Sequence, residues 1–145
     1  MMGDIVLILS GFLGTFGFGI LFNIKGRRLM VSAAGGLLCC ILYVMLRALT
    51  KNEVVVYFFV SVAISIYSEI MARVVKTPVT SFITTSLIPL IPGGSLYYTM
   101  AYAFESNLPG FAEKGLYTLE LAAALAIGII LVSTLFNVFF VKKQE

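Results

Sequence analysis

A chain of 145 residues that is 60% hydrophobic and 12% charged is too apolar for a soluble domain, in which about a quarter of the residues carry charge. The composition therefore indicates an integral membrane protein. Basic residues lie in short loops between apolar stretches and give a net charge of only +3, which argues against nucleic-acid binding. Because histidine is absent and Asp4 is the sole aspartate, we expect no metal site, no cofactor and no enzyme activity.

The first two apolar stretches predict transmembrane helices over about 4–22 and 29–49. No basic leader precedes the first stretch, so we interpret it as a retained helix rather than a signal peptide. Both helices carry faces of small residues that allow close helix packing. These faces consist of Gly11, Gly14, Gly17 and Gly19 with Ser10 in the first helix, and of Ser32, Gly36 and Cys40 in the second.

The third apolar stretch, about 54–72, carries a polar stripe. Its polar residues recur at intervals of three or four and therefore share one helix face. Such a stripe can line a solute path or can bond neighbouring helices. Glu69 is a candidate for proton coupling, because acids inside a membrane are often functional; Arg73, four residues later, makes an ordinary ion pair the alternative. The stripe comprises Tyr57, Ser61, Ser65, Ser68 and Glu69.

The fourth stretch, about 78–105, is apolar but contains two prolines and two glycines between residues 89 and 94. Each proline removes an amide donor and clashes with the preceding turn, and adjacent glycines favour unwound backbone. A continuous helix over this stretch would measure roughly 42 Å, against a hydrocarbon core of about 30 Å. We therefore predict two half-helices, one over 78–88 that starts at Thr77-Pro78, and one over 96–105 with Ser95 as its N-cap.

A broken membrane helix suggests a solute site, because unwound backbone at depth must face protein or a water-filled cavity. The start of the second half-helix, at Gly94-Ser95, would offer unpaired amides and partial positive charge to a carboxylate. Hydroxyls on both half-helices would bind the other polar groups of the solute. The predicted substrate-binding residues are Ser81, Thr84, Thr85, Pro89, Pro92, Gly93, Gly94 and Ser95.

A loop is expected over 107–115, followed by a fifth helix over about 116–141, so that residues 1–145 form one all-α transmembrane domain. Charge predicts its orientation, because seven basic residues fall on one side of the five spans and three on the other. The positive-inside rule then places the N-terminus outside and the C-terminus in the cytoplasm. The richer side carries Lys25, Arg27, Arg28, Arg73, Lys76, Lys142 and Lys143, and the other side carries Arg47, Lys51 and Lys114.

Two motifs resemble the threonine/serine exporter family over roughly residues 15–140. They are the turn FN-x-x-x-R, formed by Phe22, Asn23 and Arg27, and the run Ile88-Pro89-Leu90-Ile91-Pro92-Gly93. More narrowly, the chain resembles the short subunit that is encoded separately where such an exporter is split. The resemblance implies proton-driven export of threonine and serine, or of a dicarboxylate such as succinate, across the bacterial inner membrane. It also implies a larger partner subunit, and a homo-oligomer is the other assembly we consider.

Two other classes of function compete with transport. A non-transporting scaffold that stabilises the pore of a larger partner is the alternative, because the chain is short and has several glycine-rich packing faces. The broken helix argues against it, since a scaffold needs no unwound backbone at depth. An intramembrane enzyme has little support, because histidine is absent and the acids are scattered along the sequence.

Overall fold

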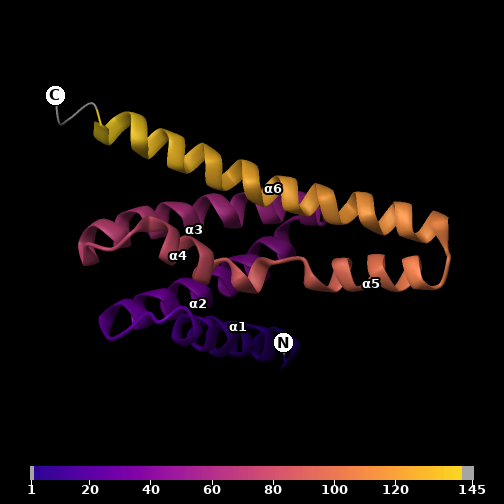
Figure 1. Cartoon of the computed structure of the whole chain (residues 1–145), viewed down its shortest axis with the longest axis horizontal. Helices are drawn as coiled ribbons and strands as arrows, with labels where there is room; N and C mark the ends of the chain where they lie inside the picture. Colours follow the sequence, from indigo (N-terminus) through magenta and orange to yellow (C-terminus); the bar gives the residue numbers. More distant parts are fainter. Residues whose placement is uncertain (1, 142–145) are drawn as a thin grey trace.

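The structure, a computed structural model, describes the backbone of residues 2–141 and the side chains of residues 3–139. All regular elements in this part of the chain are helical (Figure 1). Four helices are long and apolar enough to cross a membrane, namely α1, α2, α3 and α6. The predicted all-α membrane architecture is therefore confirmed. The elements are α1 (Met2–Leu21), α2 (Arg27–Leu49), α3 (Glu53–Val75), α4 (Val79–Ser86), the 3-10 helix η1 (Ile88–Leu90), α5 (Gly93–Phe104) and α6 (Leu108–Val141).

The broken fourth segment has its first half and its break inside the bundle. Its first half, α4, packs against both α2 and α3, and η1 packs against α1 and α2. The buried apolar cluster of the protein lies where these elements meet, so the break contributes to the core rather than forming a surface loop. This cluster contains Cys39, Val56, Val60, Ile64, Leu87 and Leu90.

Glycines allow the backbones of α1 and α2 to approach closely. A Cβ atom on Gly36 would overlap the Thr15 side chain, and one on Gly11 would overlap Cys40 Sγ. The small-residue face predicted on α2 is buried as expected. The face predicted on α1 is only partly used, because a Cβ atom on Gly14 or Gly17 would meet nothing within 4 Å.

The helices α3 and α6 run in the same direction. Near the start of α3, the Tyr117 hydroxyl of α6 donates a hydrogen bond to the Glu53 carboxylate. Near its end, the Arg73 guanidinium lies 5.0 Å from the centroid of the Phe136 ring. The segment α4–η1–α5, which connects α3 to α6 in the sequence, therefore runs back in the opposite direction (Figure 1). That the fourth segment crosses the membrane stays a prediction; Lys142 and Lys143, on which the charge argument also depended, lie outside the described residues.

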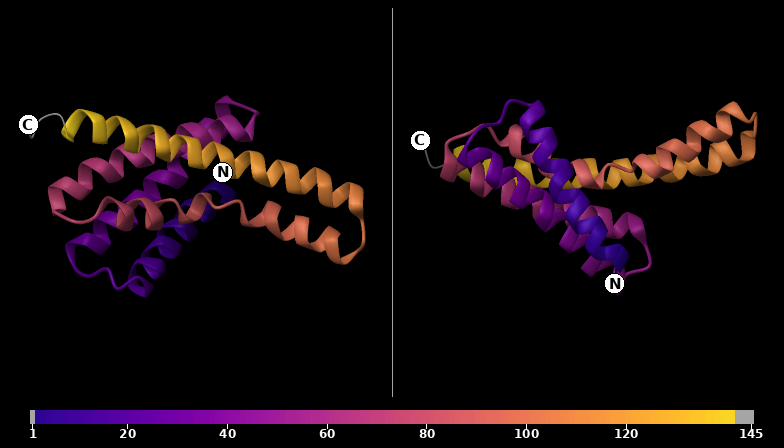
Figure 2. Two further views of the ribbon diagram at one scale, coloured as in Figure 1. Left: turned by 45° about the horizontal axis from the view of Figure 1, so that its top comes forward. Right: turned by 90° about the horizontal axis from the view of Figure 1, so that it is seen from below.

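The loop predicted over 107–115 is wrong, because α6 already begins at Leu108. The Asn107 side chain accepts a hydrogen bond from the Gly110 amide at 3.1 Å, as an N-cap residue does. Pro109 fits the first turn, where a missing amide loses no helical bond. The helix therefore has 34 residues and measures roughly 51 Å. Its early part pairs with α5 in a hairpin that extends beyond the other helices (Figures 1 and 2).

Two hydroxyls of the polar stripe on α3 are buried without a partner. Among the described residues, neither Ser65 Oγ nor Ser68 Oγ has a hydrogen-bond partner, whereas Ser61 Oγ donates to the Phe58 carbonyl at 2.8 Å. An unsatisfied buried hydroxyl costs about 1–3 kcal/mol. We expect the double substitution of Ser65→Ala and Ser68→Ala to raise the free energy of unfolding by about 1 kcal/mol or more. Ser61→Ala, which removes a satisfied hydroxyl, should lower it; denaturant titration in detergent would measure both changes.

Candidate solute site at the broken helix

The break begins where proline stops the helix. The helix α4 ends at Ser86, and η1 continues with tighter bonds, from the Leu90 amide to the Leu87 carbonyl and from the Ile91 amide to the Ile88 carbonyl. Pro89 and Pro92 supply no amide, so a regular helical ladder cannot pass through this stretch. Ile91 is extended, with φ −60° and ψ 126°, and the chain then enters α5.

The ends of both half-helices differ slightly from the prediction. The first starts at Val79, with Pro78 at the cap position, and the Thr77 hydroxyl bonds the Val75 carbonyl instead of capping the helix. The second starts at Gly93, so Ser95 lies inside its first turn and is not its N-cap. The amides of Gly94 and Ser95 still occupy the turn where helix geometry leaves donors without partners, and no side chain caps α5 within the described residues.

The break lies level with the middle of α1 and α2. Pro89 Cβ would lie 3.5 Å from a Cβ atom on Gly11, close to the centre of α1. Cys39 and Cys40, near the middle of α2, line the same space as Pro89. Because α1 and α2 are both long enough to span a membrane, the break is at mid-depth of the bundle.

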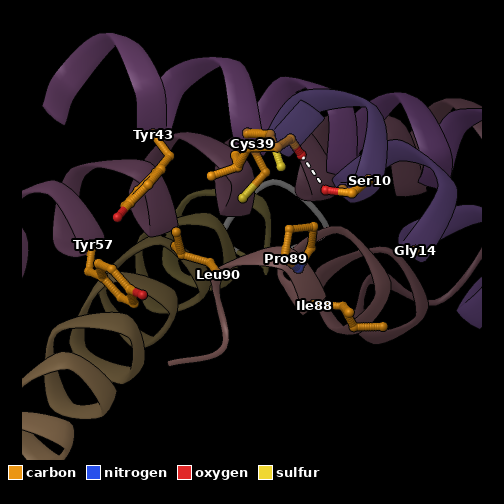
Figure 3. A pocket seen from close by; sticks show the side chains of 11 residues that line it. Ser10, Gly14, Cys39, Tyr43, Tyr57, Ile88, Pro89 and Leu90 are labelled. Carbon is orange, nitrogen blue, oxygen red and sulfur yellow. Dashed lines mark hydrogen bonds between the residues drawn. The ribbon is translucent and has the colours of Figure 1, made fainter. Parts of the chain in front are cut away.

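A cavity of about 340 Å³ opens beside the break, between α1, α2, α3 and η1. Figure 3 shows Tyr43 and Tyr57 at one side of it, and Ser10 with Pro89 and Ile88 at the other. The two tyrosine rings meet edge to face, with centroids 5.9 Å apart. The lining is mainly apolar, with tyrosine and serine hydroxyls as its polar groups, which is the usual make-up of a small-molecule site. It comprises Leu7, Ser10, Gly11, Gly14, Cys39, Cys40, Tyr43, Tyr57, Ile88, Pro89 and Leu90.

The structure does not bring the eight predicted site residues together in one cavity. Pro89 alone lines the mid-depth cavity, whereas Ser81 and Thr84 line a second one, of about 300 Å³, with Phe22, Ile24 and Thr80. Thr85 is buried and bonds both Ser32 Oγ and the Ser81 carbonyl. The remaining four lie at the start of α5 and line none of the cavities described for residues 3–139; they are Pro92, Gly93, Gly94 and Ser95.

The predicted set omitted the hydroxyl groups that face the mid-depth cavity from other helices. Ser10 was predicted only as part of a packing face, and Tyr43 gave no periodic signal of its own, because their place at the cavity depends on how α1 and α2 pack against η1. Tyr57 did give a signal, as the first residue of the polar stripe on α3. The polar stripe on α3 therefore reaches the mid-depth cavity at Tyr57, and its other end, at Glu69, lies at the contact between α3 and α6.

Glu69 lies away from these cavities and is buried, with 4% of its surface exposed. Its carboxylate forms an ion pair with Arg73 Nη1, which also donates to the Glu69 carbonyl at 2.6 Å. The guanidinium stacks on Phe136 of α6 at the same time. The ion pair considered as the alternative for Glu69 is therefore present within α3, and the contact of Arg73 with Phe136 joins α3 to α6.

The chain matches a known protein family over most of its length. A family model described as "Threonine/Serine exporter, ThrE" matches residues 7–135, which include the α1–α2 turn, the whole broken segment and most of α6. No curated protein and no solved structure matches the chain. The match covers every residue that lines the mid-depth cavity.

Proposed function

This chain belongs to the threonine/serine exporter family, and from that membership we propose that it is a subunit of a secondary transporter for small solutes that carry a carboxylate. Threonine and serine are the proposed solutes, with succinate as a further one, and the bacterial inner membrane is the proposed location. The observation that carries this proposal is the mid-depth cavity beside the broken helix. A site at this depth can be reached from either side in turn.

The proposed solute position uses both the cavity and the free helix start. Tyr43, Tyr57 and Ser10 would hold the polar groups of a small amino acid in the cavity. The unpaired amides of Gly94 and Ser95, next to the break, would receive its carboxylate when α5 moves toward the cavity, because a helix N-terminus favours an anion.

The proposed path to this position follows α4. Ser81 and Thr84 line the second cavity at one end of α4, and Pro89 lines the mid-depth cavity at the other. Between the two cavities, Ser32 of α2 and Thr85 of α4 share a buried hydrogen bond. Transport then requires α2 and α4 to separate at this contact, which makes the hydrogen bond the proposed barrier between the two ends.

We propose Glu69 as the proton carrier, since it is a buried acid whose protonation would release Arg73 from the α3–α6 seam. Glu69→Gln cannot change protonation, so we expect solute exchange between equal pH values to persist while efflux driven by a pH gradient falls to background. Proteoliposomes that contain both subunits and are loaded with labelled threonine would measure both rates. Glu113→Gln, at an exposed position on α6, is the control and should behave as the unmodified protein. Full gradient-driven efflux by Glu69→Gln would remove Glu69 from the coupling mechanism.

We propose a larger partner subunit, and the α5–α6 hairpin supports this. Among the described helices, α6 is the one against which α5 packs extensively, and Tyr97, Tyr98 and Phe104 are exposed on the outer surface of α5. The proposed orientation places the N-terminus outside and the C-terminus in the cytoplasm, and the charge count of the sequence supports it.

Efflux from cells tests the proposed function. Cells would be loaded with labelled threonine, serine or succinate, and a pH gradient would be imposed and then collapsed. The measurement would compare this chain alone, the larger subunit alone, and both together. Gradient-dependent efflux that needs both subunits is the expected result. Efflux by the larger subunit alone at the same rate would favour the scaffold function, and an absence of efflux with both proteins in the membrane would contradict export of these solutes.

A further inference from the structure

A third cavity, of about 490 Å³, lies at the end of the bundle where the α1–α2 turn meets the start of α4. It differs from the mid-depth cavity in being lined by cations. Lys25 and Arg28 contribute from the α1–α2 side, and Thr77 and Ser81 contribute hydroxyls from the α4 side. None of the described residues that line it is acidic. We call this space the basic vestibule.

The two cations of the basic vestibule have no ion-pair partner among the described residues. Within the part of the chain that the structure describes, neither Lys25 nor Arg28 is in an ion pair, and both are exposed. Arg27 and Lys76 are adjacent in sequence to residues of the lining and add to the local positive charge. A cavity with this charge, and with no counterion in the part of the chain that the structure describes, favours an anionic ligand.

Backbone groups add to the positive field. The helices α2 and α4 both begin beside the basic vestibule, and neither has a side-chain cap. Their first amides lack helical partners, and their dipoles place partial positive charge at this end. Residues with positive φ shape the two turns that precede α2 and α4. The φ angle is 57° at Asn23, 62° at Gly26 and 53° at Lys76. Phe22 and Asn23 of the FN-x-x-x-R turn, which the mid-depth site left unexplained, line the vestibule, and Arg27 lies next to the lining residue Arg28.

We propose that the basic vestibule binds an oxyanion, and that this oxyanion is the carboxylate of the solute at its entry to the transport path. The assignment to the solute rests on the proposed export function. Ser81 supports it, because it lines both the vestibule and the second cavity, which continues along α4 toward the break. The phosphate of an anionic lipid headgroup has the same chemistry, and the experiment below separates the two sources.

Binding to the purified full chain in nanodiscs tests the proposal. In discs of phosphatidylcholine alone, labelled L-threonine would be bound at equilibrium and competed with succinate or with L-threoninamide, which lacks the carboxylate. In discs that also contain phosphatidylglycerol, retained lipid would be counted by native mass spectrometry. The variant combines Lys25→Gln and Arg28→Gln. Lys51→Gln is the matched control, because it removes an exposed lysine at the opposite end of the bundle, away from the three cavities.

We expect succinate to displace threonine and L-threoninamide to fail. The double variant should bind threonine roughly tenfold more weakly or worse, since hydrogen bonds to two charged groups are lost. Lys51→Gln should leave the affinity unchanged. Loss of phosphatidylglycerol from the double variant, without any effect on threonine, would overturn the solute assignment and give the site to a lipid headgroup. Equal behaviour of the double variant and Lys51→Gln toward both probes would overturn the oxyanion site itself.

The efflux assay in cells would show a failure of the export function separately from a failure of the oxyanion site. If cells with both subunits release none of the three solutes while phosphatidylglycerol is still lost from the double variant, export is contradicted and the oxyanion site remains with a lipid as its ligand. If efflux is normal and the double variant transports with unchanged apparent KM, the basic vestibule is not on the solute path. Thermal stability of each variant in detergent would show that the exposed substitutions leave the fold intact.

Discussion

Gly14→Leu is expected to stop transport while the protein remains folded. Gly14 lines the mid-depth cavity, and a Cβ atom at this position would meet nothing within 4 Å. A leucine side chain can therefore enter the cavity without pushing α1 away from its neighbours, and it would take space that the solute needs. We expect a loss of threonine efflux on the order of a hundredfold, comparable with the effect of misplacing a bound substrate.

Gly17→Leu is the matched control for this change. Gly17 lies on the same helix, is equally free of contacts within 4 Å, and lines none of the cavities described here. The two variants add the same apolar side chain to α1, so helix propensity and membrane insertion change alike. Efflux assays on cells with matched amounts of each variant would compare them. Equal efflux by both variants would mean that the mid-depth cavity does not hold the solute.

The break itself could be predicted from the sequence, because its cause is local. Pro89 and Pro92 lack amides, and this alone prevents a continuous helix. The start of α5 was predicted less well, with Ser95 as a cap where the structure begins the helix at Gly93. Serine is a common N-cap, but Pro92 before two glycines lets the helix begin three residues earlier. The loop predicted at Asn107 was wrong for a similar reason. The sequence after Asn107 resembles a turn, but Asn107 is the N-cap of α6.

The composition of the cavity could not be predicted from local patterns. Ser10, Tyr43 and Tyr57 come from three helices, and they face one space only because α1 and α2 pack closely around Pro89. That packing depends on which glycine meets which side chain across the helix contact. The sequence indicated small-residue faces on both helices, but it did not indicate that Gly14 would be left without a neighbour and so open to the cavity.

Close packing of α1 on α2 is therefore a condition for the site, and Gly36→Ala should disrupt it. A Cβ atom on Gly36 would overlap Thr15 Oγ1 and come within 2.8 Å of Thr15 Cγ2, and Thr15 is fully buried. Overpacking of a close contact typically costs about 1–3 kcal/mol. We expect the free energy of unfolding in detergent to fall by about 2 kcal/mol or more, and transport to fall with it as α1 moves away from Pro89.

A compensating substitution distinguishes this contact from a general effect of alanine. Thr15→Gly removes every side-chain atom that a Cβ on Gly36 would overlap, so the combination with Gly36→Ala should recover part of the lost stability. Gly17→Ala adds the same methyl group where nothing lies within 4 Å, and it should leave stability unchanged or slightly higher because alanine favours a helix. A double mutant with the summed loss of its two single substitutions would contradict direct contact between Gly36 and Thr15, and with it the packing that forms the cavity.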